Sequence, residues 1–157
     1  MRMSALPLCL SCALLVAPAA QADPYVDLID YPQQEANWDR FFALEGRLQQ
    51  GFDTICGDTF CEGEYSDIHP LRLRCSVDAA RGTVRECLWA FAASDLAVSA
   101  NDGVIEARQP TWLCRLPLVA GTPVESFHAA LAARDPLHDP LPGSSQSVYD
   151  ALTECIH

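Results

Sequence analysis

The sequence contains no lysine, and all 10 of its basic residues are arginine. It also lacks the G-x-S-x-G turn of serine hydrolases, the H-E-x-x-H zinc motif and a glycine-rich phosphate loop. Outside the first 22 residues there is no C-x-x-C pair and no apolar run of the roughly 18–20 residues that a bilayer span needs. These absences argue against several common enzyme classes and against a membrane-spanning chain, and no motif indicates a cofactor.

Acidic residues outnumber basic ones about two to one. The 21 acids and 10 arginines give the 157-residue chain a formal charge of −11. A strongly negative surface repels phosphate backbones and anionic headgroups, so we expect neither nucleic-acid nor membrane-surface binding. Half of the residues are hydrophobic, and the length suits a single domain with its own core. A basic protein is the partner that this charge favours, because opposite fields accelerate encounter.

The N-terminus is typical of a cleavable signal peptide. Arg2 precedes an apolar stretch over 6–17, and Ala20-Gln21-Ala22 forms an A-x-A cleavage site. Cleavage there leaves one domain over 23–157 with 21 acids and 9 arginines, a charge of −12. Cys9 and Cys12 fit a lipid-anchor site poorly. The absence of lysine is consistent with a GC-rich genome, and we expect a bacterial periplasmic or secreted protein.

Cleavage would also leave an even number of cysteines, which in an oxidising compartment predicts disulfides. Six cysteines allow 15 pairings, so their number alone does not choose among them. Cys56 and Cys61 are close enough in sequence to close a short loop. The expected strand register places Cys75 opposite Cys87, and the remaining two cysteines then pair by elimination. The predicted bridges are Cys56–Cys61, Cys75–Cys87 and Cys114–Cys155.

Hydrophobic periodicity predicts one helix followed by a hairpin. Apolar residues recur at helical spacing from Glu35 to Phe52, with Gly51 as the expected stop, and Thr54–His69 resembles an irregular loop. The period then changes to two in 71–77 and in 83–93, with a turn between them. A turn centred on Arg81 would place Leu71 opposite Phe91, Leu73 opposite Trp89 and Cys75 opposite Cys87, all on one face.

The rest of the chain predicts a third strand and two helices. Asn101-Asp102-Gly103 indicates a turn before a strand region over 104–118, in which Pro110 suggests an edge or a bulge. Thr122-Pro123-Val124-Glu125 resembles a capped helix start, and a last helix is expected over 147–156. The predicted fold is α+β: an N-terminal helix, a three- to four-stranded antiparallel meander and two C-terminal helices, stapled by disulfides, with the helices on the Trp89 and Trp112 face.

An acidic loop is the first candidate site. Asp58, Glu62, Glu64 and Asp67 lie close together in sequence and could ligate calcium. An EF-hand loop that starts at Asp58 would need an oxygen ligand where Phe60 stands and a glutamate where His69 stands. A solvated acidic loop is therefore the simpler interpretation, with a non-standard calcium site as the alternative.

The outward sheet face and the histidines complete the candidates. Arg72, Arg74 and Arg115 should point away from the core, where they could bind a carboxylate or phosphate, or pair with Glu86 and Glu106. His128 and His138 are candidates for a small hydrolase, although no nucleophile motif accompanies them.

We therefore expect an exported, non-catalytic binding protein, of the kind that inhibits or confers immunity to a basic protein. The alternatives are a small periplasmic hydrolase with its site near His128 and His138, and a calcium-stabilised structural module.

Overall fold

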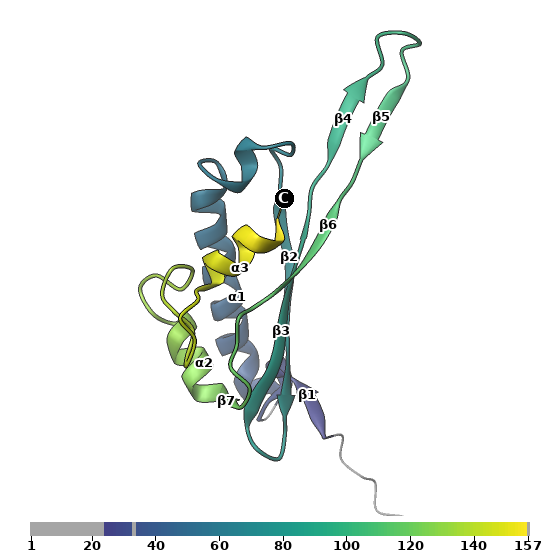
Figure 1. Cartoon of the computed structure of the whole chain (residues 1–157). Coiled ribbons are helices and arrows are strands. Elements are labelled where there is room, and N and C mark those ends of the chain that lie inside the picture. The colour runs from purple at the N-terminus through teal and green to yellow at the C-terminus, as the bar shows by residue number, and fades with distance from the viewer. Residues whose placement is uncertain (1–23, 33, 157) are drawn as a thin grey trace, which may run out of the picture.

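The computed structural model describes residues 24–32 and 34–156, so the predicted signal peptide and its cleavage site lie outside the described residues. An antiparallel sheet is covered on one face by three α-helices (Figure 1). The main sheet has the strand order β1 (Tyr25–Asp27), β2 (His69–Asp78), β3 (Thr83–Ala92), β6 (Thr111–Arg115), and the short β7 (Thr122–Pro123) also pairs with β3. The predicted α+β architecture is confirmed.

Helix α1 (Gln34–Cys56) is longer than the sequence predicts and follows a short 3-10 turn, η1 (Leu28–Asp30). Its buried stripe consists of Phe41, Leu44, Leu48 and Phe52. Trp38 and Phe42 belong to the apolar pattern predicted over Glu35 to Phe52, but their side chains are 43% and 54% exposed. The stripe that one helix buries covers only part of its circumference, so these two aromatic rings fall outside it.

The expected helix stop at Gly51 is wrong, because α1 continues through this residue to Cys56. Gly51 allows close packing instead: a Cβ atom there would lie 3.0 Å from the Cδ1 atom of Leu137. The loop that was expected from Thr54 therefore begins after Cys56, and it contains the 3-10 turn η2 (Phe60–Glu62).

The predicted register of β2 and β3 is correct at its centre, where Leu73 pairs with Trp89 and Cys75 with Cys87. Leu71 does not face Phe91, because the register shifts between Pro70 and Arg72 and Pro70 takes that place. Leu71 is consequently 53% exposed. The bulge adds one residue to β2, which alternation in the sequence cannot reveal.

Strand region 104–118 is divided at Pro110, as its sequence suggested. Residues before the proline form β5 (Ile105–Arg108), and those after it form β6. β5 pairs with β4 (Asp95–Val98), a strand that the sequence reasoning did not assign, across the predicted turn at Gly103. β4 and β5 prolong β3 and β6 beyond the main sheet as a two-stranded arm (Figure 1).

The C-terminal helices are α2 (Val124–Leu131) and α3 (Val148–Cys155). The predicted cap of α2 is wrong: Pro123 is the N-cap, while the Thr122 hydroxyl donates to the Val119 carbonyl, 2.7 Å away. β-Sheet pairing with Val84 holds Thr122 in β7 and explains the shift. The apolar side chains of α2, Val124, Phe127 and Leu131, are buried, and α3 starts with a capping box between Ser147 and Asp150.

All three predicted disulfides are present. Cys56–Cys61 closes the end of α1, Cys75–Cys87 joins β2 to β3, and Cys114–Cys155 joins β6 to α3. Trp89 lies in the core against Phe52 of α1, with 6.2 Å between ring centroids. Trp112 is half-buried and packs instead against Tyr65 of the loop after α1. Among the described residues, no helix has the length and apolar character to cross a membrane.

The disulfides should differ in their contribution to stability. In the chain-entropy model a bridge is worth more when it closes a longer loop, which gives about 4 kcal/mol for a separation of 41 residues and about 2 kcal/mol for 5. We expect the double variant Cys114→Ser/Cys155→Ser to lose more unfolding free energy in urea than Cys56→Ser/Cys61→Ser. Equal losses would contradict the entropic ranking.

Candidate functional site

The three arginines predicted on the outward sheet face do not gather into one anion site. Arg74 pairs with Asp27 of β1, 3.1 Å away, and its guanidinium lies over the ring of Phe41. Arg115 pairs with Glu86, as expected, whereas the expected partner Glu106 lies on the arm. Arg72 is exposed and has no ion-pair partner among residues 24–32 and 34–156. The geometry therefore favours surface ion pairs over a ligand cradle.

Between these arginines, the outer sheet face is apolar, and none of the helices formed by residues 24–32 and 34–156 covers it (Figure 1). The half-buried Leu88, Ala90 and Ala92 of β3 lie along it, and on β6 Leu113 is 68% exposed. Leu113 pairs with Ala90 across the two strands, so the apolar side chains of β3 and β6 adjoin. This outer face contrasts with the inner one, where Trp89 and Phe91 are buried beneath the helices.

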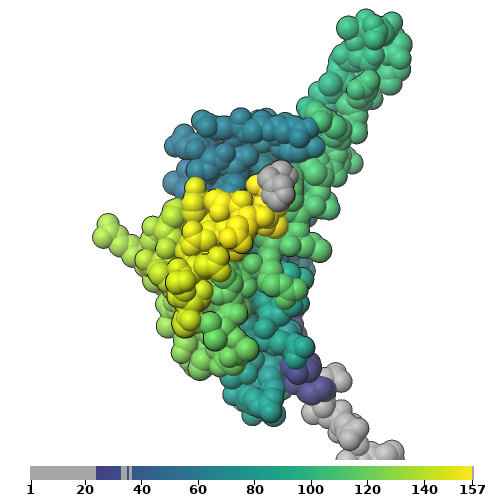
Figure 2. Space-filling model, in the orientation of Figure 1, coloured from purple at the N-terminus to yellow at the C-terminus, as the bar shows by residue number. Residues whose placement is uncertain are grey.

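The arm continues this division into two faces. Leu96 pairs with Ala107 and Val98 with Ile105, and paired residues in an antiparallel ladder share a face. The alternate pairs are Asp95 with Arg108 and Ala97 with Glu106. One side of the arm is thus wholly apolar, with Leu96, Val98 and Ile105 66%, 71% and 67% exposed. Figure 2 shows the arm standing clear of the rest of the molecule.

The base of the arm is fixed to the acidic loop on the helix side. Arg108 bonds to Asp95 through its Nε atom at 3.2 Å, pairs with Glu64, and lies over the ring of Tyr65 at 5.8 Å. Because Arg108 contacts the helix-side loop, the apolar face of the arm must point the other way. It therefore continues the outer face of the main sheet, on which Leu113 lies.

Asp67 provides a second attachment between the acidic loop and the arm. The Ser94 hydroxyl and amide donate to its two carboxylate oxygens, at 2.6 and 3.0 Å. These two hydrogen bonds hold the pKa of Asp67 below its ordinary value. Neither Ser94 nor Arg108 was identified from the sequence, since their partners lie 27 and 44 residues away.

The four acids of the calcium hypothesis are not assembled around a common point. Glu64 and Asp67 bind Arg108 and Ser94, whereas Asp58 and Glu62 are exposed. Within the described ranges, no three His, Cys, Asp or Glu side chains are grouped as a metal site would require. The loop uses its acids to hold the arm and to give this end of the molecule a negative charge.

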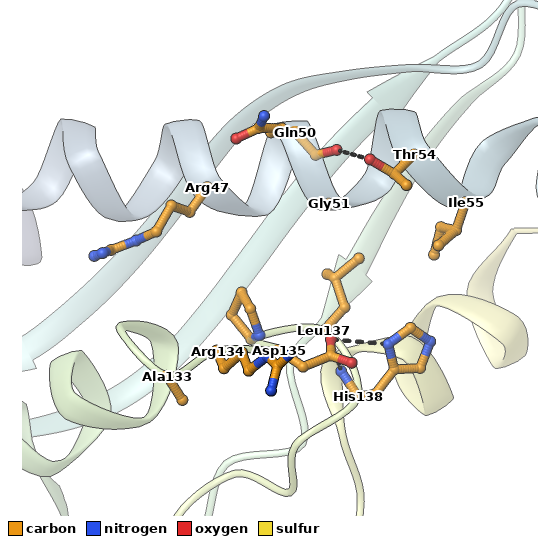
Figure 3. Close-up of a pocket in the computed structure, with 11 residues that line it drawn as sticks. Arg47, Gln50, Gly51, Thr54, Ile55, Ala133, Arg134, Asp135, Leu137 and His138 are labelled. Carbon is orange, nitrogen blue, oxygen red and sulfur yellow. Dashed lines mark hydrogen bonds and ion pairs between the residues drawn. The ribbon is translucent and has the colours of Figure 1, made fainter.

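A hollow of about 430 Å³ lies between α1 and the segment after α2, and contains His138 (Figure 3). The His138 Nδ1 atom lies 2.9 Å from the Asp135 carboxylate, and its ring packs on Tyr149. The Asp135 pKa is lowered, mainly by this side-chain contact. Thr54, the hydroxyl residue that lines the hollow, donates to the Gln50 carbonyl at 2.9 Å. The described residues that line the hollow thus include a His–Asp pair but no serine.

His128 lies in a different place and is a packed histidine, as its position on α2 suggested. It is only 6% exposed, and its Nε2 atom has no hydrogen-bond partner among the described residues. Arg40 and Arg47 of α1 and Glu125 of α2 line the same shallow surface. Burial, and secondarily the positive charge of Arg40, lowers the pKa of His128 to about 4, so the ring is neutral near pH 7. The two histidines line different hollows and do not form one site.

This buried imidazole predicts a pH dependence of stability. Between pH 6.5 and 4 the unfolded chain binds a proton at His128 and the folded protein does not, so the free energy of unfolding falls as the pH falls through that window. The slope from one such group is at most about 1.4 kcal/mol per pH unit. Urea unfolding of His128→Leu should lack this contribution, whereas the exposed control His138→Gln should retain it. Parallel curves for wild type and His128→Leu would refute the assignment.

Comparison of the chain with protein-family models, with curated proteins and with solved structures gives no match. The geometry of the described residues is then the guide to function, and its distinctive features are the open sheet face, the projecting arm and the acidic loop that holds the arm.

Proposed function

We propose that this chain is an exported, non-catalytic binding protein that recognises a basic protein partner. The observation that carries the proposal is the outer sheet face, which is apolar, is left uncovered by the helices of the described part of the chain and is prolonged by the arm. Contiguous exposed apolar surface in a soluble domain is typical of an interaction site.

Charge supports the choice of a basic partner. The acidic loop contains Asp58, Glu62, Glu64 and Asp67, and the arm adds three further acids. Arg108 is the only arginine in these two segments, and Asp95 and Glu64 already neutralise it. A field of one sign at this end of the molecule attracts a partner of opposite sign and speeds association.

The disulfides support export. Three bridges are consistent with a non-cytoplasmic compartment, where thiols oxidise and stay oxidised. With the signal peptide predicted over 1–22, we propose the periplasm or the medium as the location. Inhibitors of cationic wall-degrading enzymes act there and belong to the class of protein that we propose.

A salt-dependent pull-down from a periplasmic extract tests the proposal. The mature protein should retain proteins with a net positive charge at low ionic strength and release them at high salt, because screening weakens the attraction. The triple variant Asp58→Asn/Glu62→Gln/Glu106→Gln removes three exposed acids at the arm end and should retain much less. No basic protein in the low-salt fraction would refute the proposal.

A matched variant separates local charge from total charge. Glu35→Gln/Asp39→Asn/Asp139→Asn removes the same charge from exposed positions outside the acidic loop and the arm. It should behave like the wild type if the arm end is the contact region. An equal loss in both triple variants would show that only the net charge matters.

A further inference from the structure

Two arginines without an acidic partner line the hollow between α1 and the segment after α2. Arg47 comes from α1 and Arg134 from the segment that follows α2, so they belong to opposite walls (Figure 3). Both side chains are exposed, and within residues 24–32 and 34–156 neither forms an ion pair. The structure thus leaves both guanidinium groups available to a ligand.

The charge of this hollow is opposite to that of the protein. Among the described residues that line it, Asp135 is the one carboxylate, and it is already in contact with His138 at 2.9 Å. With the histidine counted as neutral, two arginines and one acid give the lining a net charge of +1, whereas 23–157 as a whole carries −12. Salt screens charges beyond about 8 Å at physiological ionic strength, so an ion in the hollow interacts mainly with the lining.

The floor of the hollow is apolar. Residues four apart lie on one stripe of a helix, so Gly51 falls between Arg47 and Ile55 on the surface of α1 and leaves a recess there. Leu137, which is only 2% exposed, and Pro136 close the recess from the opposite wall. A volume of about 430 Å³ lies within the range of small-molecule sites. The lining therefore suits an anionic group attached to a short apolar body.

We propose that this hollow binds a small monocarboxylate. Arg47 and Arg134 hold the carboxylate group from the two walls, because a guanidinium donates paired N–H groups to its two oxygens. The apolar body lies against Ile55, Pro136 and Leu137. A monoanion matches the net charge of +1, whereas a phosphate dianion would exceed it. The inference does not depend on the proposed function, since the hollow lies on the helix side and the outer sheet face on the other.

An NMR titration of the ¹⁵N-labelled mature protein tests the inference. Benzoate and hexanoate are the probes, added at pH 7.5 and constant ionic strength. We expect saturable shifts of the Gly51 and Leu137 backbone amide signals with a Kd on the order of 1 mM, as suits ligands of this size. Benzamide has nearly the same shape as benzoate but no charge, and it should bind at least about 10-fold more weakly.

Single variants then test the two anchors. Arg47→Gln and Arg134→Gln should each weaken benzoate binding about 10-fold, because each removes hydrogen bonds between charged groups. The matched control is Arg72→Gln, which removes the same charge from an exposed arginine of β2 that also has no ion-pair partner among the described residues. It should change the Kd by less than about 2-fold, since salt screens its distant charge. Unchanged melting temperatures would exclude misfolding as the cause.

Four results would overturn the inference. No saturable shift with either carboxylate would show that the hollow does not bind this class of ligand. Equal binding of benzamide would show that apolar contact alone is sufficient, and tighter binding of phenyl phosphate would assign the hollow to another anion. An equal loss in Arg72→Gln would show that only the net charge matters. The pull-down with basic proteins is a separate measurement, so its outcome and this one can differ.

Discussion

The pairing of β2 with β3 is the constraint on which the rest of the structure depends. Leu73 lies opposite Trp89 and Cys75 opposite Cys87, so both strands turn their large apolar side chains to the same side. A slip of one residue would turn one strand over and place half of this set in solvent. Because β6 and β7 both pair with β3, the side chains that they bury lie on the same face of the sheet as those of β3. The helices cover this face.

Covering the sheet on one side leaves its other side available for recognition. Polar residues usually occupy the solvent face of an antiparallel sheet. Here Leu88, Ala90 and Leu113 lie on that face instead. Strands β4 and β5 of the arm also place apolar residues on one face and charged residues on the other. The acidic loop adds charge where the apolar surface begins. A single sheet thus separates two tasks: one face holds the domain together and the other is exposed to partners.

The sequence was informative wherever the same residues fixed both local periodicity and burial. Alternation in 71–77 and in 83–93, with a turn centred on Arg81, placed Cys75 opposite Cys87, and elimination then paired Cys114 with Cys155. The exposed position of Leu71 was not predictable, because a bulge leaves no mark in a hydrophobic pattern. Gly51 suggested a helix end because the close approach of Leu137 arises from a loop 86 residues away in the chain.

The site was harder to predict than the fold for a related reason. Residues 95–98 contain two large apolar side chains that are exposed in the folded domain, so they resembled neither a core strand nor a loop. Arg108 and Ser94 gain their importance from partners on the acidic loop, which sequence spacing does not connect to them. Three arginines with the right alternation suggested a ligand site, but their acidic neighbours engage two of them.

The bridge between Cys114 and Cys155 has a mechanical consequence. β6 continues the strand that forms one side of the arm, so tension applied at the arm tip passes along this strand into the domain. At Cys114 that load meets a covalent link to α3 instead of hydrogen bonds alone. A partner that pulls on the tip therefore cannot detach β6 from the sheet beyond Cys114, and the arm stays attached to the domain under load.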